Sequence, residues 1–243
     1  MAAQPSWHQL ASGAALDTAR RHPTTKLSHH LSEDGAVRVG PVDAFRLARR
    51  TFIAGERVDM GALAAELAVD RATLFRWVGN REQLLSEVIW SVSLPTWRRA
   101  LDEASGSGAA RVVEVFDRFT RAVIGAEFFR RYLRRERDRA LRLLTTRAGV
   151  HQARVAATFE GLLDAERQAS GLKLPLPVHD TAYVITRVAE SFIYSDLIVG
   201  EEPDAAKAAA VVAAILHAGG SPPGEASTPP VSTSTSTAPL EQP

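Results

Sequence analysis

The chain has 243 residues, carries 29 lysines and arginines against 28 acidic residues, and contains no cysteine. The missing thiols exclude a disulfide framework, a zinc–thiolate site, an iron–sulfur cluster and a cysteine nucleophile, and they favour a reducing cytoplasm as the location. The longest uncharged apolar run, Ala208 to Leu216, has nine residues, whereas a membrane span needs roughly 20.

The two ends of the chain differ from its middle. Residues 1–39 mix weak apolar patches with turn signals, so we expect a flexible arm, in which a metal site at His29 and His30 would lack rigid partners. Residues 219–243 are rich in Pro, Ser and Thr, which predicts a disordered tail because little apolar surface can be buried. Between them, apolar residues recur at helical spacing with almost no strand alternation, which predicts an all-α protein.

The first part of this helical segment divides into short pieces. Pro41 fits the first turn of a helix that ends near Gly55, and Asp59 is a suitable N-cap for a short second helix. After a break at residues 68–70, a third helix is expected over residues 71–78, which Gly79-Asn80 closes.

A longer fourth helix is expected to start near Arg81, and Pro95 should kink or end it. Beyond a loop at residues 106–108, helical patterns cover five more stretches, at residues 109–125, 128–145, 149–170, 179–199 and 204–217. We therefore expect two helical domains, over residues 40–90 and 91–218.

Two short helices joined by a tight turn, under a first helix and before a long fourth, form a helix-turn-helix unit. Three motifs lie in this unit: Leu63-Ala-Ala-Glu-Leu-Ala-Val69, Thr73-Leu-Phe-Arg-Trp-Val78 and Asn80-Arg-Glu-Gln-Leu-Leu85. With them, residues 42–90 resemble the N-terminal DNA-binding domain of the TetR family of transcriptional repressors. The resemblance implies that the third helix enters the major groove of double-stranded DNA.

The resemblance also assigns contacts to single positions. In the family, the first residues of the third helix contact the bases, and here these are Arg71, Ala72 and Thr73. An arginine there can donate to both major-groove acceptors of a guanine. Arg81 stands at the start of the fourth helix, where free N–H groups also attract a phosphate. The DNA-contacting residues predicted in this way are Arg71, Thr73, Arg76, Trp77 and Arg81.

Several positions depart from the family pattern. Phe75 replaces a tyrosine whose hydroxyl reaches a phosphate, and Ala68 replaces a glycine in the turn. A left-handed conformation at Ala68 would cost on the order of 1 kcal/mol. Met60 and Gly61 lack the donors that some members use on the DNA backbone. These departures keep an alternative open, namely a helical ligand-binding or protein-interaction module with degenerate DNA recognition.

The distribution of charge along the chain supports DNA binding, although the total net charge does not. Residues 38–81 contain eight arginines against five acidic residues, an excess of three that the near-neutral total hides. The competing interpretation is an ordinary three-helix packing unit, for which the buried leucines would be the same.

The resemblance makes the second domain a sensor that binds a small molecule and dimerises through its last two long helices. A polar stripe at Tyr183, Arg187, Glu190 and Tyr194 runs along an otherwise apolar helix. It predicts either a pocket wall whose polar groups orient a ligand, or an intrahelical Arg187–Glu190 pair with tyrosines at a dimer seam. The candidate ligand-binding residues are these four.

Two other groups of residues allow two interpretations each. The aromatic residues of the central helices could line an apolar cavity or form plain core; they are Trp90, Trp97, Phe116, Phe119, Phe128, Phe129, Tyr132 and Phe159. A run of arginines is either a solvated face or a second nucleic-acid surface; it comprises Arg130, Arg131, Arg134, Arg135, Arg137, Arg139 and Arg142.

Short motifs at residues 143–147, 183–187, 190–194 and 200–203 resemble actinobacterial TetR-family members that regulate quorum-sensing lactone degradation, which implies a lactone or similar signal as inducer. No nucleophile elbow, zinc-protease motif or phosphate-binding glycine loop is present, so neither an enzyme nor a cofactor is expected. The predicted function is a ligand-responsive repressor that binds a pseudo-palindromic operator as a homodimer.

Overall fold

The computed structural model describes residues 39–146 and 150–218, and every regular element in these ranges is an α-helix. This confirms the predicted all-α class. None of the described helices is long and apolar enough to cross a membrane. The expected N-terminal arm up to residue 38, with His29 and His30, and the expected tail from residue 219 lie outside the described residues.

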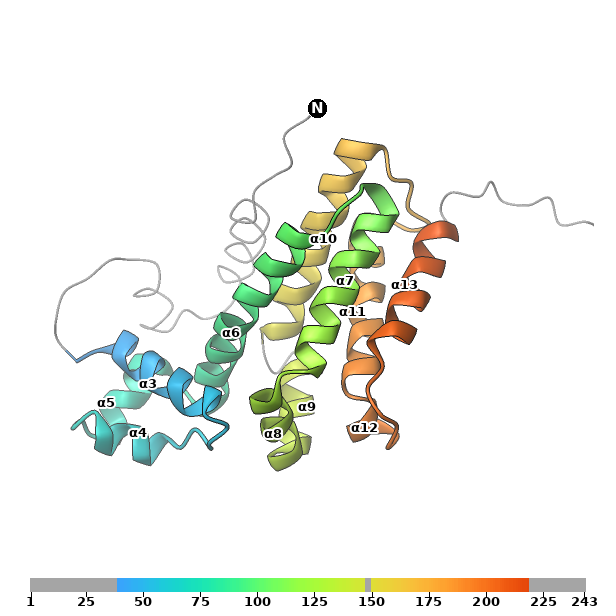
Figure 1. The fold of residues 1–243 in the computed structure, drawn as a ribbon. Helices are drawn as coiled ribbons and strands as arrows, with labels where there is room; N and C mark the ends of the chain where they lie inside the picture. Colours follow the sequence, from blue (N-terminus) through green and yellow to red (C-terminus); the bar gives the residue numbers. More distant parts are fainter. Residues whose placement is uncertain (1–38, 147–149, 219–243) are drawn as a thin grey trace, which may run out of the picture.

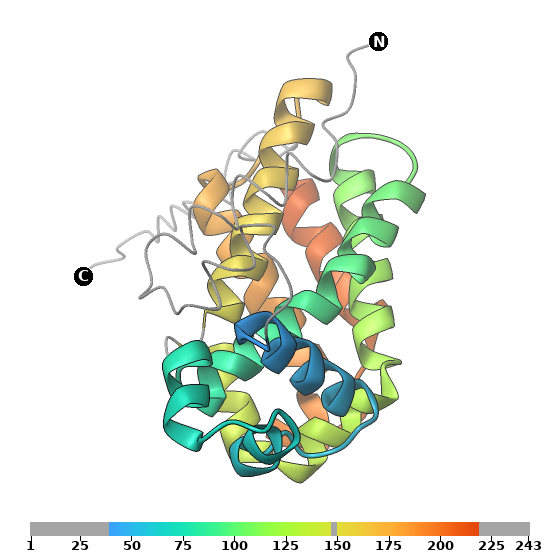
Figure 2. The ribbon, with the colours of Figure 1, turned by 90° about the vertical axis from the view of Figure 1, so that its left-hand side faces the viewer.

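The helices form a small N-terminal cluster and a larger bundle (Figure 1). The cluster consists of α3 (Pro41–Ile53), α4 (Met60–Glu66) and α5 (Arg71–Val78). From it the long helix α6 (Arg81–Glu103) leads into the bundle, across the expected domain boundary at residue 90. The bundle continues with α7 (Gly108–Ile124), α8 (Glu127–Arg135), α9 (Arg137–Thr145), α10 (His151–Ser170), α11 (Val178–Ile193), α12 (Ser195–Ile198) and α13 (Ala205–Ala218). In the view of Figure 2 the cluster lies in front of the lower end of the bundle.

The helix starts of the cluster are set by local side chains. Asp59 accepts hydrogen bonds from the backbone N–H groups of Gly61 and Ala62, at 2.8 and 2.9 Å, which confirms it as the N-cap of α4. Asp70 caps α5 through Thr73 N at 2.7 Å, and Asn80 caps α6 through Gln83 N at 2.8 Å. Such caps satisfy N–H groups that have no partner within the helix, and so they fix where α4, α5 and α6 begin.

The turn between α4 and α5 contains a strained residue. Ala68 has a φ of 54°, and it is the only non-glycine among the described residues with a positive φ. We expect Ala68→Gly to raise the free energy of unfolding by about 1 kcal/mol, because glycine takes this conformation without the Cβ contact. Urea denaturation measures the change. The control is Ala65→Gly in the exposed interior of α4, which should lower stability by about 1 kcal/mol, and a loss in both variants would contradict the prediction.

Pro95 lies inside α6, which continues to Glu103, so of the two expected outcomes, a kink or an end, the end at Pro95 is wrong. A proline removes only one backbone donor, and Trp97 beyond it is fully buried in the core. Two other predicted helix limits are also corrected. The predicted helix over residues 128–145 is split at Glu136, whose φ and ψ are −130° and 41°. The predicted helix over residues 179–199 ends at Ile193, and the short α12 follows.

The cluster and the bundle share one hydrophobic core. The ring of Phe52 in α3 packs against two rings of α8, with centroid distances of 5.8 Å to Phe128 and 5.3 Å to Tyr132. Both contacts are edge-on, a favourable arrangement for aromatic pairs. The N-terminal helices are therefore packed directly on α8 as well as joined to α6.

Candidate functional site

Helix α5 has one buried and one exposed face. Leu74 and Val78 are 0% and 1% exposed and pack into the core. The opposite face presents the exposed residues Arg71, Ala72, Phe75 and Arg76. Neighbours within this set are one, three or four positions apart, so they form one continuous patch on the helix surface. We call this patch, made of Arg71, Ala72, Phe75 and Arg76, the outer face of α5.

The predicted base-reading residues differ in what they can still bind. The hydroxyl of Thr73 donates to Asp70 Oδ2 at 2.8 Å and accepts from Arg76 Nη2 at 2.9 Å. Arg71 makes no hydrogen bond or close ion pair with any described residue, although its charge adds to the backbone hydrogen bonds that lower the pKa of Asp59, so its guanidinium is available. Trp77 is half-buried and packs against the core instead of projecting outwards.

Arg81 is the first residue of α6, as expected, but its side chain is engaged within the protein. Its Nη1 and Nη2 donate to the two carboxylate oxygens of Glu136, at 2.7 and 2.6 Å, and its Nε donates to the carbonyl oxygen of Val58 at 2.5 Å. The side chains of Arg81 and Glu136 are only 13% and 8% exposed. This geometry offers no free edge for a phosphate, because Glu136 at the α8–α9 break occupies the guanidinium. A local sequence pattern carries no information on Glu136 as the partner of Arg81, because the two are 55 residues apart.

Three of the seven arginines of the run, Arg130, Arg135 and Arg137, join different elements. Arg130 is buried, donates to the carbonyl oxygen of Ile193 at 3.0 Å and pairs with Asp196. Arg135 donates to the carbonyl oxygen of Gly55 in the α3–α4 loop. These contacts, with Arg131 and Arg134 on Glu127 and Arg137 on Leu197 O, favour a structural role for the run.

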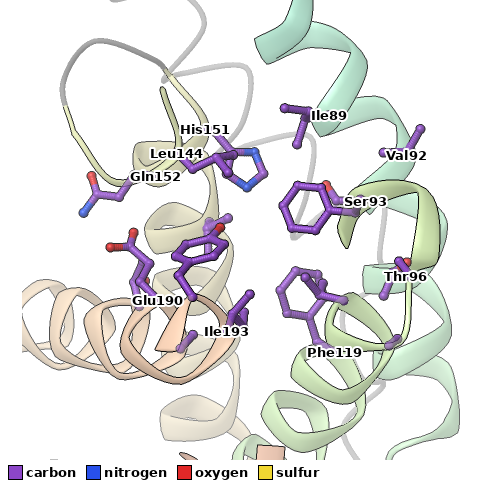
Figure 3. A pocket seen from close by; sticks show the side chains of 18 of the residues that line it. Ile89, Val92, Ser93, Thr96, Phe119, Leu144, His151, Gln152, Glu190 and Ile193 are labelled. Carbon is purple, nitrogen blue, oxygen red and sulfur yellow. The ribbon is translucent and has the colours of Figure 1, made fainter. Parts of the chain in front are cut away.

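A cavity of about 70 Å³ lies inside the bundle, where side chains of α6, α7, α8, α10 and α11 meet. Its walls are mainly apolar, and Figure 3 shows Ile89 of α6 and Phe119 of α7 facing Glu190 and Ile193 of α11 across it. Of the aromatic residues considered above, Phe119, Phe128 and Phe129 line this cavity, and the other five are core. Three of the eight aromatic residues therefore line a cavity, and the other five form plain core.

Two polar side chains at the cavity have atoms without a hydrogen bond. The hydroxyls of Ser93 and Thr186 are satisfied by backbone carbonyls at 2.8 Å. His151 Nδ1 and Glu190 Oε2, in contrast, are buried without a hydrogen-bond partner. A buried polar atom without a partner is costly, so these two atoms are the natural anchors for a polar ligand.

Burial governs the charge state of both groups. It lowers the pKa of His151 to about 4, with the charge of Arg154 adding to the shift, so the imidazole is neutral. It raises the pKa of Glu190 to about 7, against the opposite influence of Arg187. Arg187 Nη1 approaches Glu190 Oε2 to 2.6 Å, but without the alignment of a hydrogen bond, and it also donates to the carbonyl oxygen of Thr145 at 3.0 Å.

The predicted polar stripe does not face the cavity along its whole length. Glu190 and Tyr194 line the cavity, whereas Tyr183 is 49% exposed and Arg187 is also exposed. The reason is rotational: at about 100° per residue, Ala189, which faces the cavity, is turned by about 120° from Tyr183. The stripe therefore lies at the edge of the cavity-facing side, and the Arg187–Glu190 pair and the cavity coexist.

Among the described residues, no three His, Asp or Glu side chains come together as a possible metal site. Residues 107–217 match the protein family described as Tetracyclin repressor-like, C-terminal domain. Among solved structures, the chain is similar to the R. erythropolis transcriptional repressor QsdR from the TetR family, with 29% identity and a TM-score of 0.68. That similarity covers 73% of this chain and 94% of the repressor's chain. No curated protein matches the chain.

Proposed function

We propose that this chain is a TetR-family transcriptional regulator, a DNA-binding and ligand-responsive repressor, which the family match over residues 107–217 and the similarity to a TetR-family repressor support. We also propose an effector class and a route of response. The proposed effector is an uncharged lactone or a similar carbonyl compound, bound in the cavity of the bundle. The repressor acts as a homodimer on a pseudo-palindromic operator, in the cytoplasm. Its two recognition helices α5 then enter successive major grooves about 34 Å apart.

Two buried cavity atoms without a hydrogen bond, His151 Nδ1 and Glu190 Oε2, carry this proposal, and Glu190 Oε2 has Arg187 Nη1 beside it at 2.6 Å. A neutral imidazole and a carboxyl group with a pKa of about 7 provide no fixed charge for an ionic ligand. When protonated, Glu190 can donate to a ligand carbonyl, the group that a lactone ring supplies. The apolar walls suit the hydrocarbon part of such a molecule.

The size of the cavity suggests how binding reaches the DNA. A volume of about 70 Å³ holds roughly five to seven waters at 10–15 Å³ of probe volume each. In our proposal a ligand longer than a bare ring displaces wall helices. Phe128 of α8 lines the cavity and packs on Phe52 of the N-terminal cluster, so a displacement of α8 moves the cluster. Such a shift favours a dimer whose recognition helices no longer match the operator spacing.

The outer surfaces of α11 and α13 are suitable for dimerisation. Tyr183 in α11 and Val211 in α13 are large exposed side chains, 49% and 39% accessible. Lys207, Ala210, Ala214 and His217 extend the exposed face of α13. The small side chains of Ala210 and Ala214, at helical spacing, allow the α13 helices of two protomers to approach closely. Such an approach supports the dimer-seam role for Tyr183 in α11.

Operator release by lactones tests the effector. The wild-type protein should shift DNA from its own promoter region in a gel, and lactones of increasing acyl length should reverse the shift. Glu190→Leu, which has no donor, should still bind DNA but need roughly ten- to a hundredfold more lactone, because the carbonyl loses its hydrogen bond. Glu160→Leu, at a partly exposed carboxylate of α10, is the matched control. A Glu190→Leu response equal to that of the control contradicts the assignment.

A further inference from the structure

The outer face of α5 contains a large apolar side chain in an unusual place. Phe75 is 41% exposed, although aromatic rings gain most when they are buried. The core does not need this ring, since Leu74 and Val78 already fill the inner side of α5. Ala72 lies beside Phe75 on the same face and is also exposed. The helix therefore presents an apolar strip, Ala72 and Phe75, to whatever it binds.

The surroundings of this strip are cationic. Arg71 precedes Phe75 by one turn, and Arg76 follows Ala72 by one turn, so the two arginines flank the strip. This arrangement fits a polyanion whose accessible edge also contains small apolar groups. In the major groove of DNA the apolar group is the 5-methyl of thymine, and alanine and phenylalanine are side chains that contact it.

The hydrogen-bonding capacity of α5 points in the same direction. The hydroxyl of Thr73 is engaged by Asp70 and Arg76, and Phe75 has no hydroxyl for a phosphate. The donors of the outer face that remain for base edges are Arg71 and the N–H groups of Arg76 that do not bind Thr73. Ala72 and Phe75 are separated by about 4.5 Å along the helix axis, close to the roughly 3.4 Å between base pairs, so they can meet neighbouring pairs.

We propose that Phe75, with Ala72, reads thymine methyl groups in each half-site of the operator. The proposal rests on the DNA-binding function of the chain and assigns Phe75 to specificity, in place of the phosphate contact that a tyrosine would make. A thymine on at least one base pair next to the Arg71 contact is then a feature of every strong site.

Deoxyuridine tests the proposal directly, because it pairs like thymidine and lacks only the methyl group. The operator is first obtained by selection from random DNA, and each thymine of a half-site is then replaced singly by deoxyuridine. Wild-type protein should lose roughly fourfold in affinity at one or two positions, the effect of removing one buried methyl group. Phe75→Ala should bind the thymine operator more weakly and be insensitive to deoxyuridine at the position that Phe75 reads.

Two variants separate methyl reading from general weakening. Phe75→Tyr keeps the ring and should keep the sensitivity to deoxyuridine. Arg71→Ala should lose affinity and base preference but remain sensitive to deoxyuridine, because it removes a different contact. Equal binding of both operators by the wild type, or a Phe75→Ala variant that stays sensitive, overturns the proposal. Failure of the wild type to select any DNA at low salt would instead overturn DNA binding itself.

Discussion

Replacing Glu136 with glutamine should lower the free energy of unfolding by about 3–5 kcal/mol, the loss typical of a buried ion pair that has lost one partner. Glu136 holds both Nη atoms of Arg81, and both side chains are almost entirely shielded from water. Glutamine keeps one acceptor oxygen but carries no charge and turns an NH2 group towards the guanidinium, so Arg81 stays buried without its counter-ion. Thermal or urea unfolding followed by circular dichroism measures this loss.

Glu127→Gln is the matched control for this experiment. Glu127 also pairs with arginines of α8, but its side chain is 61% exposed, so its loss should cost at most about 1 kcal/mol. The position of Glu136 adds a functional expectation: because Arg81 starts α6 and Glu136 ends α8, the variant should weaken coupling between lactone and DNA. Equal stability of the two variants would mean that the Arg81–Glu136 pair contributes little.

The two cavity groups should make opposite contributions to the pH dependence of stability. The pKa of Glu190 is raised to about 7 in the folded protein from 4.5. The folded state therefore binds the proton more tightly, and stability falls as the pH rises between these values. The pKa of His151 is lowered to about 4 from 6.5. For this group the unfolded state binds the proton first, so stability is lost as the pH falls through that window.

Single variants should reveal the two effects, which largely cancel in the wild type. As the pH rises from 4.5 to 7, the free energy of unfolding of Glu190→Gln should increase relative to that of the wild type by on the order of 2–3 kcal/mol. His151→Phe, which keeps an aromatic ring beside Trp90, should show the opposite trend and gain stability relative to the wild type as the pH falls from 6.5 towards 4. Urea unfolding across this range measures both, and a Glu190→Gln difference that does not change with pH contradicts the raised pKa.

Ligand affinity should follow the same titration. If protonated Glu190 donates to the carbonyl of the lactone, affinity must fall as the pH rises through about 7, where the carboxyl group ionises. Glu190→Gln, whose amide N–H can donate at every pH, should show no such fall. Calorimetric titration of one lactone at several pH values checks this, and a flat wild-type profile would show that Glu190 does not donate to the ligand.

The helix-turn-helix unit could be predicted almost completely from the sequence. Asp59 caps α4 as expected, and Ala68 takes the left-handed conformation that the position of a family glycine suggested. Both features depend on groups within about four residues of each other, which is the range over which sequence patterns carry direct information. The face of α5 follows in the same way, because the burial of Leu74 and Val78 sets its orientation.

The candidate site could be predicted only in part. Glu190 and Tyr194 line the cavity, but Tyr183 and Arg187 on the same stripe do not. His151 showed no signal in the sequence, since one histidine at the start of a helix looks like any other polar residue. Its role depends on Trp90, Arg154 and the walls around it, which come from other parts of the chain.

The sequence by itself determined the helical class, the start of each N-terminal helix and the arginines on the recognition helix, because these depend on periodicity and on neighbours in the chain. Only the tertiary structure decided that Arg81 pairs with Glu136, and that Glu190 and His151 share a cavity. Both the ion pair and the cavity bring together residues from helices that are distant in the chain. The free energy of a charged or polar group in such a place is set by burial and by partners that no local pattern encodes.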